Sequence, residues 1–561
     1  MKQPKNSLLI PILIFLGLLL AFSPVFLSSN YIRQDDLMWE IWEGMKISDF
    51  GWLYKNTVFQ LVRPICMISF YLTDLISINI TDAVYVRFMA VIILGFLGIL
   101  LYRWQLLFNS NRALAASFAA ASFTLPAYQV FAATGNYSLI LTALLMTFGA
   151  AFCWHHAYQT DQPKQKSRYY RLGCFLFFAS LLDYPLSSMY IWVLLTISYL
   201  NGREYLQRKF IAHASWVSIK IMVYYYIFCR LVHLVFHVKT NNGRAAVIDL
   251  SQIGEKIKHF YDTTGWHSSL WFWKSTGPLH QTPFILIVVV FCLALIKTGK
   301  LNGETCLRNN LKHASLALLI TFIFYSLSYS PIFASPELLV TFRYTITTMP
   351  IFLYLIFWSV NVLIGTLFLN RPLLNKIINT CNSIVFVCVA FFGLTYANIM
   401  LADGIVGPHT QDFDNIQKQL NEKVLPLLKQ NKQIVIHAIA CDNGDEATRF
   451  APNIPSQFEY GMRICQYQQQ VLGAIVHSLK KMGYASNFNR KNKLVHKENE
   501  IIVNDIPWGT LVVTSAINRN VDLREYTENN RPVITIDTLA MPIYQRFDFY
   551  HQLIAQFKGA G

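Results

Sequence analysis

Residues 84–108 read VYVRFMAVIILGFLGILLYRWQLLF, a stretch of 25 residues in which Arg87 and Arg103 are the only charged side chains. About 18 or more mainly apolar residues are enough for an α-helix to cross the hydrocarbon layer of a membrane. The stretch therefore predicts a transmembrane helix.

Similar apolar runs recur along the chain, which is 54% hydrophobic and only 14% charged. We interpret eleven runs as spans, of which the fifth, sixth and eighth are short. They are residues 8–27, 84–108, 114–131, 138–156, 172–182, 189–200, 215–238, 283–296, 314–332, 344–369 and 383–401. The expected fold is mainly α, a polytopic membrane protein of about 11 transmembrane helices.

Basic residues predict the orientation of these spans, because short cytoplasmic loops are enriched in Lys and Arg. With the N-terminus inside, alternate connections carry seventeen Lys or Arg and three acids, a net of +14 out of the chain's +16. The positive charge is thus explained by topology, and no nucleic-acid partner is expected. The first run lacks a small-x-small cleavage site, so an uncleaved first span is expected rather than a signal peptide.

An odd number of spans places the last segment outside. We expect a transmembrane domain over residues 1–401 and an extracytoplasmic domain over 402–561, where polar helical segments alternate with short β-rich runs such as QIVIHAI and TLVVTSAI. This alternation predicts a small α/β domain. Cys441 and Cys465 both lie in it, and an oxidising compartment would permit a disulfide between them.

Two long loops are expected on the outer face, residues 28–83 and 239–282. In the first, DDLMWEIWEGMK (35–46) places acids on one helical stripe and apolar residues on the other, which predicts an amphipathic interfacial helix. A second helix is expected over 64–76, because proline is favoured at a first helical position. A similar amphipathic stretch begins the other loop.

Asp35 and Asp36 lie side by side just after the first span. One reading is a helix N-cap, in which an Asp accepts hydrogen bonds from free backbone N–H groups. The other is catalytic, because a carboxylate beside apolar surface becomes more basic and suits a general base. The sequence leaves both readings open.

Several cations are expected near outer helix ends, namely Arg63, Arg87, Lys239, Arg244 and Arg343. For most of them we expect only snorkelling to lipid headgroups. Arg63 directly precedes Pro64, and Arg343 follows Glu337 in a short loop, so these two arginines are candidates to bind a phosphate with their planar set of donors.

Further candidates for substrate binding are Glu40, Asp183, Tyr184, His267 and Glu337. An acid such as Asp183 at the end of an apolar segment is a functional candidate, although a helix-end cap before Pro185 is an ordinary alternative. Lone interfacial histidines are more often passive than catalytic.

The acidic pair in RQDD and the element LVRPI ahead of the second span resemble the GT-C class of integral-membrane glycosyltransferases, and within it the bacterial Gtr-type glucosyltransferases that modify O-antigen. TFRYTITTMP (341–350) is similar to the Arg-bearing entry to a late span in that family. LVRPI lacks the glycine of the family's GRPL-like element, and the C-terminal domain is larger than expected. The resemblance covers roughly residues 8–401 and implies an enzyme of the bacterial inner membrane.

The resemblance implies inverting transfer of glucose or another hexose from a polyprenyl-phosphate donor to a cell-surface glycan such as O-antigen, in lipopolysaccharide, on the outer face. Asp35 or Asp36 would deprotonate the acceptor hydroxyl, or orient it through a bound divalent cation, and Arg63 and Arg343 would bind the donor phosphate. No other cofactor is expected. The alternatives are a lipid-linked glycan flippase or transporter, and an O-antigen polymerase or ligase.

Overall fold

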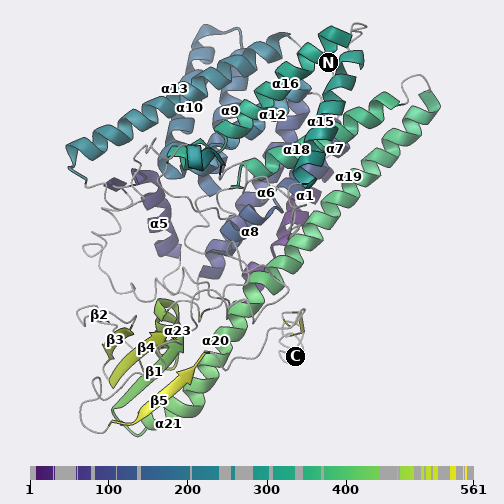
Figure 1. Ribbon diagram of the computed structural model, residues 1–561. Helices are drawn as coiled ribbons and strands as arrows, with labels where there is room; N and C mark the ends of the chain where they lie inside the picture. The colour runs from purple at the N-terminus through teal and green to yellow at the C-terminus, as the bar shows by residue number, and fades with distance from the viewer. Residues whose placement is uncertain are drawn as a thin grey trace.

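The computed structural model describes helices that form one bundle and a small sheet that lies beyond one end of it (Figure 1). The residues it describes are 8–28, 31, 58–59, 61–76, 83–108, 110–134, 141–202, 205–238, 254–258, 282–301, 307–334, 345–367, 372–440, 464, 468–484, 495–497, 501–506, 509–515, 531–538, 548 and 550–551.

The bundle contains the helices up to α19. They are α1 (Leu9–Ala21), α2 (Pro24–Leu27), α5 (Pro64–Ile76), α6 (Ala83–Leu107), α7 (Arg112–Ser122), α8 (Pro126–Ala133), α9 (Thr142–Gln159), α10 (Pro163–Asp183), α11 (Pro185–Ser188), α12 (Tyr190–Asn201), α13 (Tyr205–Val235), α15 (Thr282–Leu301), α16 (Leu307–Leu327), α17 (Ser330–Ala334), α18 (Thr348–Leu367) and α19 (Pro372–Leu401). α5 has the bounds that the sequence predicts.

Within the described residues, five helical segments are long and apolar enough to cross a membrane: Ala83–Leu107, Tyr205–Val235, Asn310–Leu327, Thr348–Thr366 and Thr380–Leu428. A sixth span results if α7 and α8, which meet at an angle of 50°, are counted together. The mainly helical, multi-pass character is thus confirmed. Each of the eleven predicted runs contains helix among its described residues, but the structure supports five or six spans by length and composition, so a total of eleven remains a prediction.

The predicted third span, residues 114–131, is a bent pair rather than one straight helix. α7 ends at Ser122 and α8 starts at Pro126. A proline has no backbone N–H and clashes with the preceding turn, so it starts a new helix more readily than it continues one. The bend places the end of α8 beside Tyr31, whose hydroxyl donates to the carbonyl of Ala133 over 3.0 Å.

α9 and α10 pack against each other through a small residue. Gly173 of α10 is buried, and a Cβ built on it would lie 2.5 Å from the indole of Trp154 and 3.1 Å from the carbonyl oxygen of Ala150 on α9. Without a side chain there, the helices can approach closely, which is the usual mode of helix packing in membranes. This contact fixes α10 against α9 ten residues before Asp183.

A continuous helix joins the bundle to the sheet. α19 runs through the π-helical turn η5 (Ala402–Val406) into α20 (Gly407–Gln419), a second π-helical turn η6 (Leu420–Val424) and α21 (Leu425–Leu428). Figure 1 shows α19 along one side of the bundle and α20 beside the sheet. Apolar side chains up to Val406 belong to the core of the bundle, and those from Phe413 onward belong to a separate core under the sheet.

The sheet has five strands in the order β2-β3-β4-β1-β5. Their bounds are β1 (Ile434–Ala440), β2 (Val495–Lys497), β3 (Ile501–Ile506), β4 (Gly509–Ser515) and β5 (Val533–Asp537), and the helix α23 (Gln468–Lys481) also belongs to this part. β1 pairs in parallel with β4 and β5, whereas β2 and β3 are antiparallel. The predicted α/β mixture is confirmed, and β2 and β3 were not predicted from the sequence. Cys441 and Cys465 lie outside the described residues.

Gly173→Ala should lower the free energy of unfolding in detergent by about 1–3 kcal/mol, because the new methyl group would overpack the contact with Trp154. Gly365→Ala on α18 is the matched control, since no atom lies within 4 Å of its Cβ position. That control should be neutral or slightly stabilising, as expected for replacing a helical glycine. Equal thermal midpoints for the two variants would contradict the role of Gly173.

Candidate functional site

Three of the nine candidate residues predicted from the sequence lie in the described part of the chain, and they come together. Arg63, Asp183 and Tyr184 meet where α5 begins and α10 ends. The guanidinium carbon of Arg63 lies 5.0 Å from the centre of the Tyr184 ring, a cation–π contact. Asp183 is close enough for its carboxylate to interact with the charge of Arg63. We call these residues, with Thr142, the Arg63 cluster.

Burial makes this arrangement energetically demanding. Asp183 is fully buried and Tyr184 is 8% exposed. A buried carboxylate is costly unless charge and hydrogen bonds compensate for lost water. The hydroxyl of Thr142 donates to Oδ2 of Asp183 over 2.7 Å. The other oxygen, Oδ1, is also buried and accepts no hydrogen bond from the described residues.

The backbone just before Arg63 is strained. Val62 has a φ of 51° and is 1% exposed. A β-branched residue rarely adopts positive φ, and such a conformation costs about 1–3 kcal/mol, so it persists only where surrounding packing imposes it. The turn directs the chain into Pro64 and α5, and it fixes the direction from which Arg63 enters the cluster.

A second cluster of buried polar side chains holds the beginning of the first loop. Arg87 on α6 is 1% exposed, donates from Nη1 to the carbonyl oxygen of Tyr31 over 2.7 Å, and lies 4.3 Å from the centre of the Tyr31 ring. The same ring makes an edge contact with His409 of α20 at 6.0 Å. We call Tyr31, Arg87 and His409 the Arg87 cluster.

The short helix α8 lies between the two clusters. Phe131 of α8 contacts Tyr184 edge to face at 5.7 Å, and the carbonyl oxygen of Ala133 accepts the Tyr31 hydroxyl. Figure 1 shows α5 and α8 toward the end of the bundle nearest the sheet. One end of the bundle therefore holds the beginning of the first loop, the start of α5 and the helix that leads into the sheet.

The expectation that Arg87 snorkels is wrong. Its guanidinium is enclosed by protein and bonded to the backbone of Tyr31, so it has no route to lipid headgroups. The sequence does contain a signal, because an arginine inside an otherwise apolar helix is costly and usually has a protein partner. That signal does not name Tyr31, which the tertiary structure supplies.

The other six predicted site residues lie outside the described residues. They are Asp35, Asp36, Glu40, His267, Glu337 and Arg343. The proposed divalent cation at Asp35 and Asp36 falls on the same segment. Among the residues that the structure does describe, no group of three or more His, Cys, Asp or Glu side chains could hold a metal ion.

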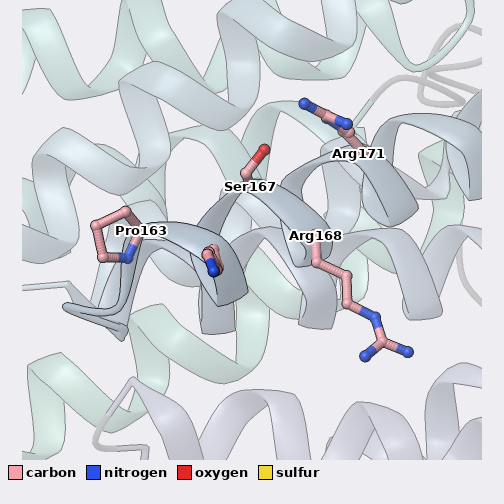
Figure 2. Close-up of a pocket in the computed structure, with 5 residues that line it drawn as sticks. Pro163, Ser167, Arg168 and Arg171 are labelled. Carbon is pink, nitrogen blue, oxygen red and sulfur yellow. The ribbon is translucent and has the colours of Figure 1, made fainter.

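Two other polar regions do not form comparable sites. The basic face at the start of α10, which contains Pro163, Lys164, Ser167, Arg168 and Arg171, is concave but open, and Figure 2 shows the Arg168 and Arg171 side chains extending in different directions. In the sheet, His437 is buried and lies 2.9 Å from the hydroxyl of Thr514. Burial lowers the pKa of His437, so its ring is neutral near pH 7 and serves packing.

Comparison of the chain with protein-family models and with curated proteins finds no match. Any statement of function must therefore come from the residues themselves.

Thr142→Val should lower the free energy of unfolding by about 1–3 kcal/mol, because Oδ2 of Asp183 would lose its bond while staying buried. Thr142→Ser should keep most of the stability. Thr147→Val on the same helix is the control, since its hydroxyl bonds only to the backbone of Ala143. Thermal unfolding in detergent would measure all three, and equal losses for Thr142→Val and Thr147→Val would contradict the assignment.

The Arg87 cluster can be tested with a double-mutant cycle. Arg87→Met and Tyr31→Leu should show a coupling energy of about 1–2 kcal/mol, the range for a desolvated cation–π pair. Arg103→Met on the exposed side of the same helix should not couple to Tyr31→Leu. If the effects of Arg87→Met and Tyr31→Leu on the free energy of unfolding are additive, the contact between the two side chains does not contribute to stability.

Proposed function

We propose that this protein is an inverting membrane glycosyltransferase of the bacterial inner membrane. It would transfer glucose or another hexose from a polyprenyl-phosphate donor to a cell-surface glycan such as O-antigen. The observation that carries the proposal is the Arg63 cluster, a half-buried arginine next to a tyrosine ring and a fully buried aspartate.

Sugar transfer from a phosphate donor requires a cationic group beside the departing phosphate. Breaking the bond between a sugar and a phosphate leaves negative charge on the phosphate, and a guanidinium already in place stabilises that charge at low dielectric. Arg63 supplies a planar set of donors that suits phosphate oxygens. Tyr184 limits the positions the guanidinium can occupy, so little reorganisation is required during the reaction.

Asp183 suits a role in binding the sugar. Its Oδ2 is occupied by Thr142, whereas Oδ1 is buried and accepts no hydrogen bond within the described residues. A carboxylate oxygen in that state would accept strongly from a sugar hydroxyl that reaches it, because burial keeps bulk water from competing for the bond. We therefore assign Asp183 to substrate binding and leave the general base to Asp35 or Asp36.

The Arg87 cluster supports the proposal indirectly. Tyr31 lies four residues before Asp35 in the sequence, and Arg87 fixes the backbone at Tyr31. Arg63 follows the acidic pair in the same loop, directly before α5. The segment that carries the acidic pair therefore begins at a residue bonded to buried Arg87 and ends at half-buried Arg63.

The proposal is tested by assaying the purified full chain in lipid nanodiscs with polyprenyl-phosphate glucose and an O-antigen acceptor. Arg63→Gln should lower kcat/KM about 10²- to 10³-fold, as expected for loss of a group that stabilises developing charge. Arg63→Lys should fall between, since it keeps the charge but loses the planar geometry. Arg103→Gln, an exposed arginine elsewhere on the bundle, is the control and should leave kcat/KM unchanged.

Alanine at Asp35 and at Asp36 should abolish transfer while the folded protein stays in the membrane. Full activity in both single variants and in the double variant would remove the general-base assignment. Transport of a labelled lipid-linked glycan without any transfer would instead support the flippase. Wild-type turnover by Arg63→Gln would remove the Arg63 cluster from the active site.

A further inference from the structure

A large cavity lies among α7, α12, α13, α15, α16 and α18, with a volume of about 990 Å³. It does not belong to the Arg63 cluster. α12 starts at Tyr190, beside α11, and ends eleven residues later at Asn201, which lines the cavity. At 1.5 Å per residue, Asn201 lies roughly 16 Å along the helix axis from the start of α12, the end nearer Tyr184.

The cavity is polar at one end and apolar along its length. Its polar end is formed where α12 finishes and α7, α13 and α16 begin, by Ser110, Asn111, Asn201, Arg208 and His313. Along its length it is lined by apolar and aromatic side chains, including Trp192, Ile219, Ile320, Phe324 and Leu327. The lining residues that the structure describes include one arginine, one histidine and no acid.

The polar end has a defined structure. The side-chain amide of Asn201 donates to the hydroxyl of Ser110 over 2.9 Å and to the hydroxyl of Tyr354 on α18. Trp358 donates from its indole to the carbonyl oxygen of Leu200 over 3.2 Å. These bonds tie the end of α12 to α7 and α18, so Asn201 and its neighbours form a fixed wall beside Arg208.

α16 forms a wall that also faces the membrane. The lining residues Leu316 and Ile323 are 55% and 43% exposed, and only 22% of the apolar window of this helix is buried. From His313 to Leu327 the wall extends over fourteen residues, roughly 21 Å. One leaflet of the hydrocarbon core is about 15 Å thick. The dimensions fit a headgroup region and one acyl layer.

We propose that this cavity binds a membrane glycerophospholipid with an anionic headgroup. The acyl chain lies along α16 against Trp192 and Phe324, and the phosphate lies at the polar end beside Arg208 and His313. Positive charge without any described acid favours an anionic over a zwitterionic headgroup, and the apolar length excludes a free phosphate as the natural occupant. This site is separate from the proposed sugar-transfer site and does not depend on it.

Native mass spectrometry of the full chain, taken from vesicles of equal parts phosphatidylglycerol and phosphatidylcholine with the same acyl chains, tests the proposal. The wild type should retain more phosphatidylglycerol than phosphatidylcholine. Arg208→Gln should retain about fivefold less phosphatidylglycerol than the wild type, the effect expected for loss of one cationic side chain. Lys209→Gln removes the same charge from the adjacent residue, which lies over the Tyr205 ring and outside the cavity, and should retain the wild-type amount.

A second pair of variants tests the apolar part. Ala317→Trp fills the cavity and should release the lipid, whereas Leu318→Trp places the same side chain on the next residue of α16, which does not line the cavity, and should not. Equal lipid retention in all four variants would overturn the proposal. So would a wild type that does not prefer phosphatidylglycerol, or one that prefers added polyprenyl phosphate at this site.

Discussion

Buried charge is the constraint on which the end of the bundle near the sheet depends. A guanidinium or carboxylate enclosed by apolar side chains is stable only if protein groups replace the water it has lost. Arg87 meets this requirement through the carbonyl and ring of Tyr31, and Asp183 meets it through Thr142 and the charge of Arg63. Both sets of contacts join segments that are far apart in the sequence. The buried charges therefore determine which helix ends meet.

The same constraint connects the bundle to the sheet. The helix that begins as α19 continues without interruption through η5 and α20, and His409 on it contacts the ring of Tyr31. A hydroxyl pair, Ser28 and Thr410, lies 3.4 Å apart in the same region. The sheet is therefore attached by a helix that packs against the beginning of the first loop, which restricts how the sheet can move relative to the Arg87 cluster.

The two ends of the bundle differ in chemistry. Near the sheet, buried Arg87 and half-buried Arg63 each lie against a tyrosine ring, and Arg63 also lies near an acid, which suits a reaction that develops charge. At the other end of α12, Arg208 lies at the mouth of an apolar cavity, which suits a lipid. This contrast separates the proposed sugar-transfer site from the proposed lipid site within one helical bundle.

The sequence by itself determined the mainly helical, multi-pass fold, the helix that starts at Pro64 and the α/β composition of the C-terminal part. Apolar runs and proline positions are local signals, and each element forms from its own residues. It also singled out Arg63, Asp183 and Tyr184 as separate candidates. Only the tertiary structure decided that these three residues meet, that Arg87 is buried against Tyr31 and that β2 and β3 join the sheet. Such contacts depend on side chains distant in the sequence, whose packing and charge compensation no local pattern specifies.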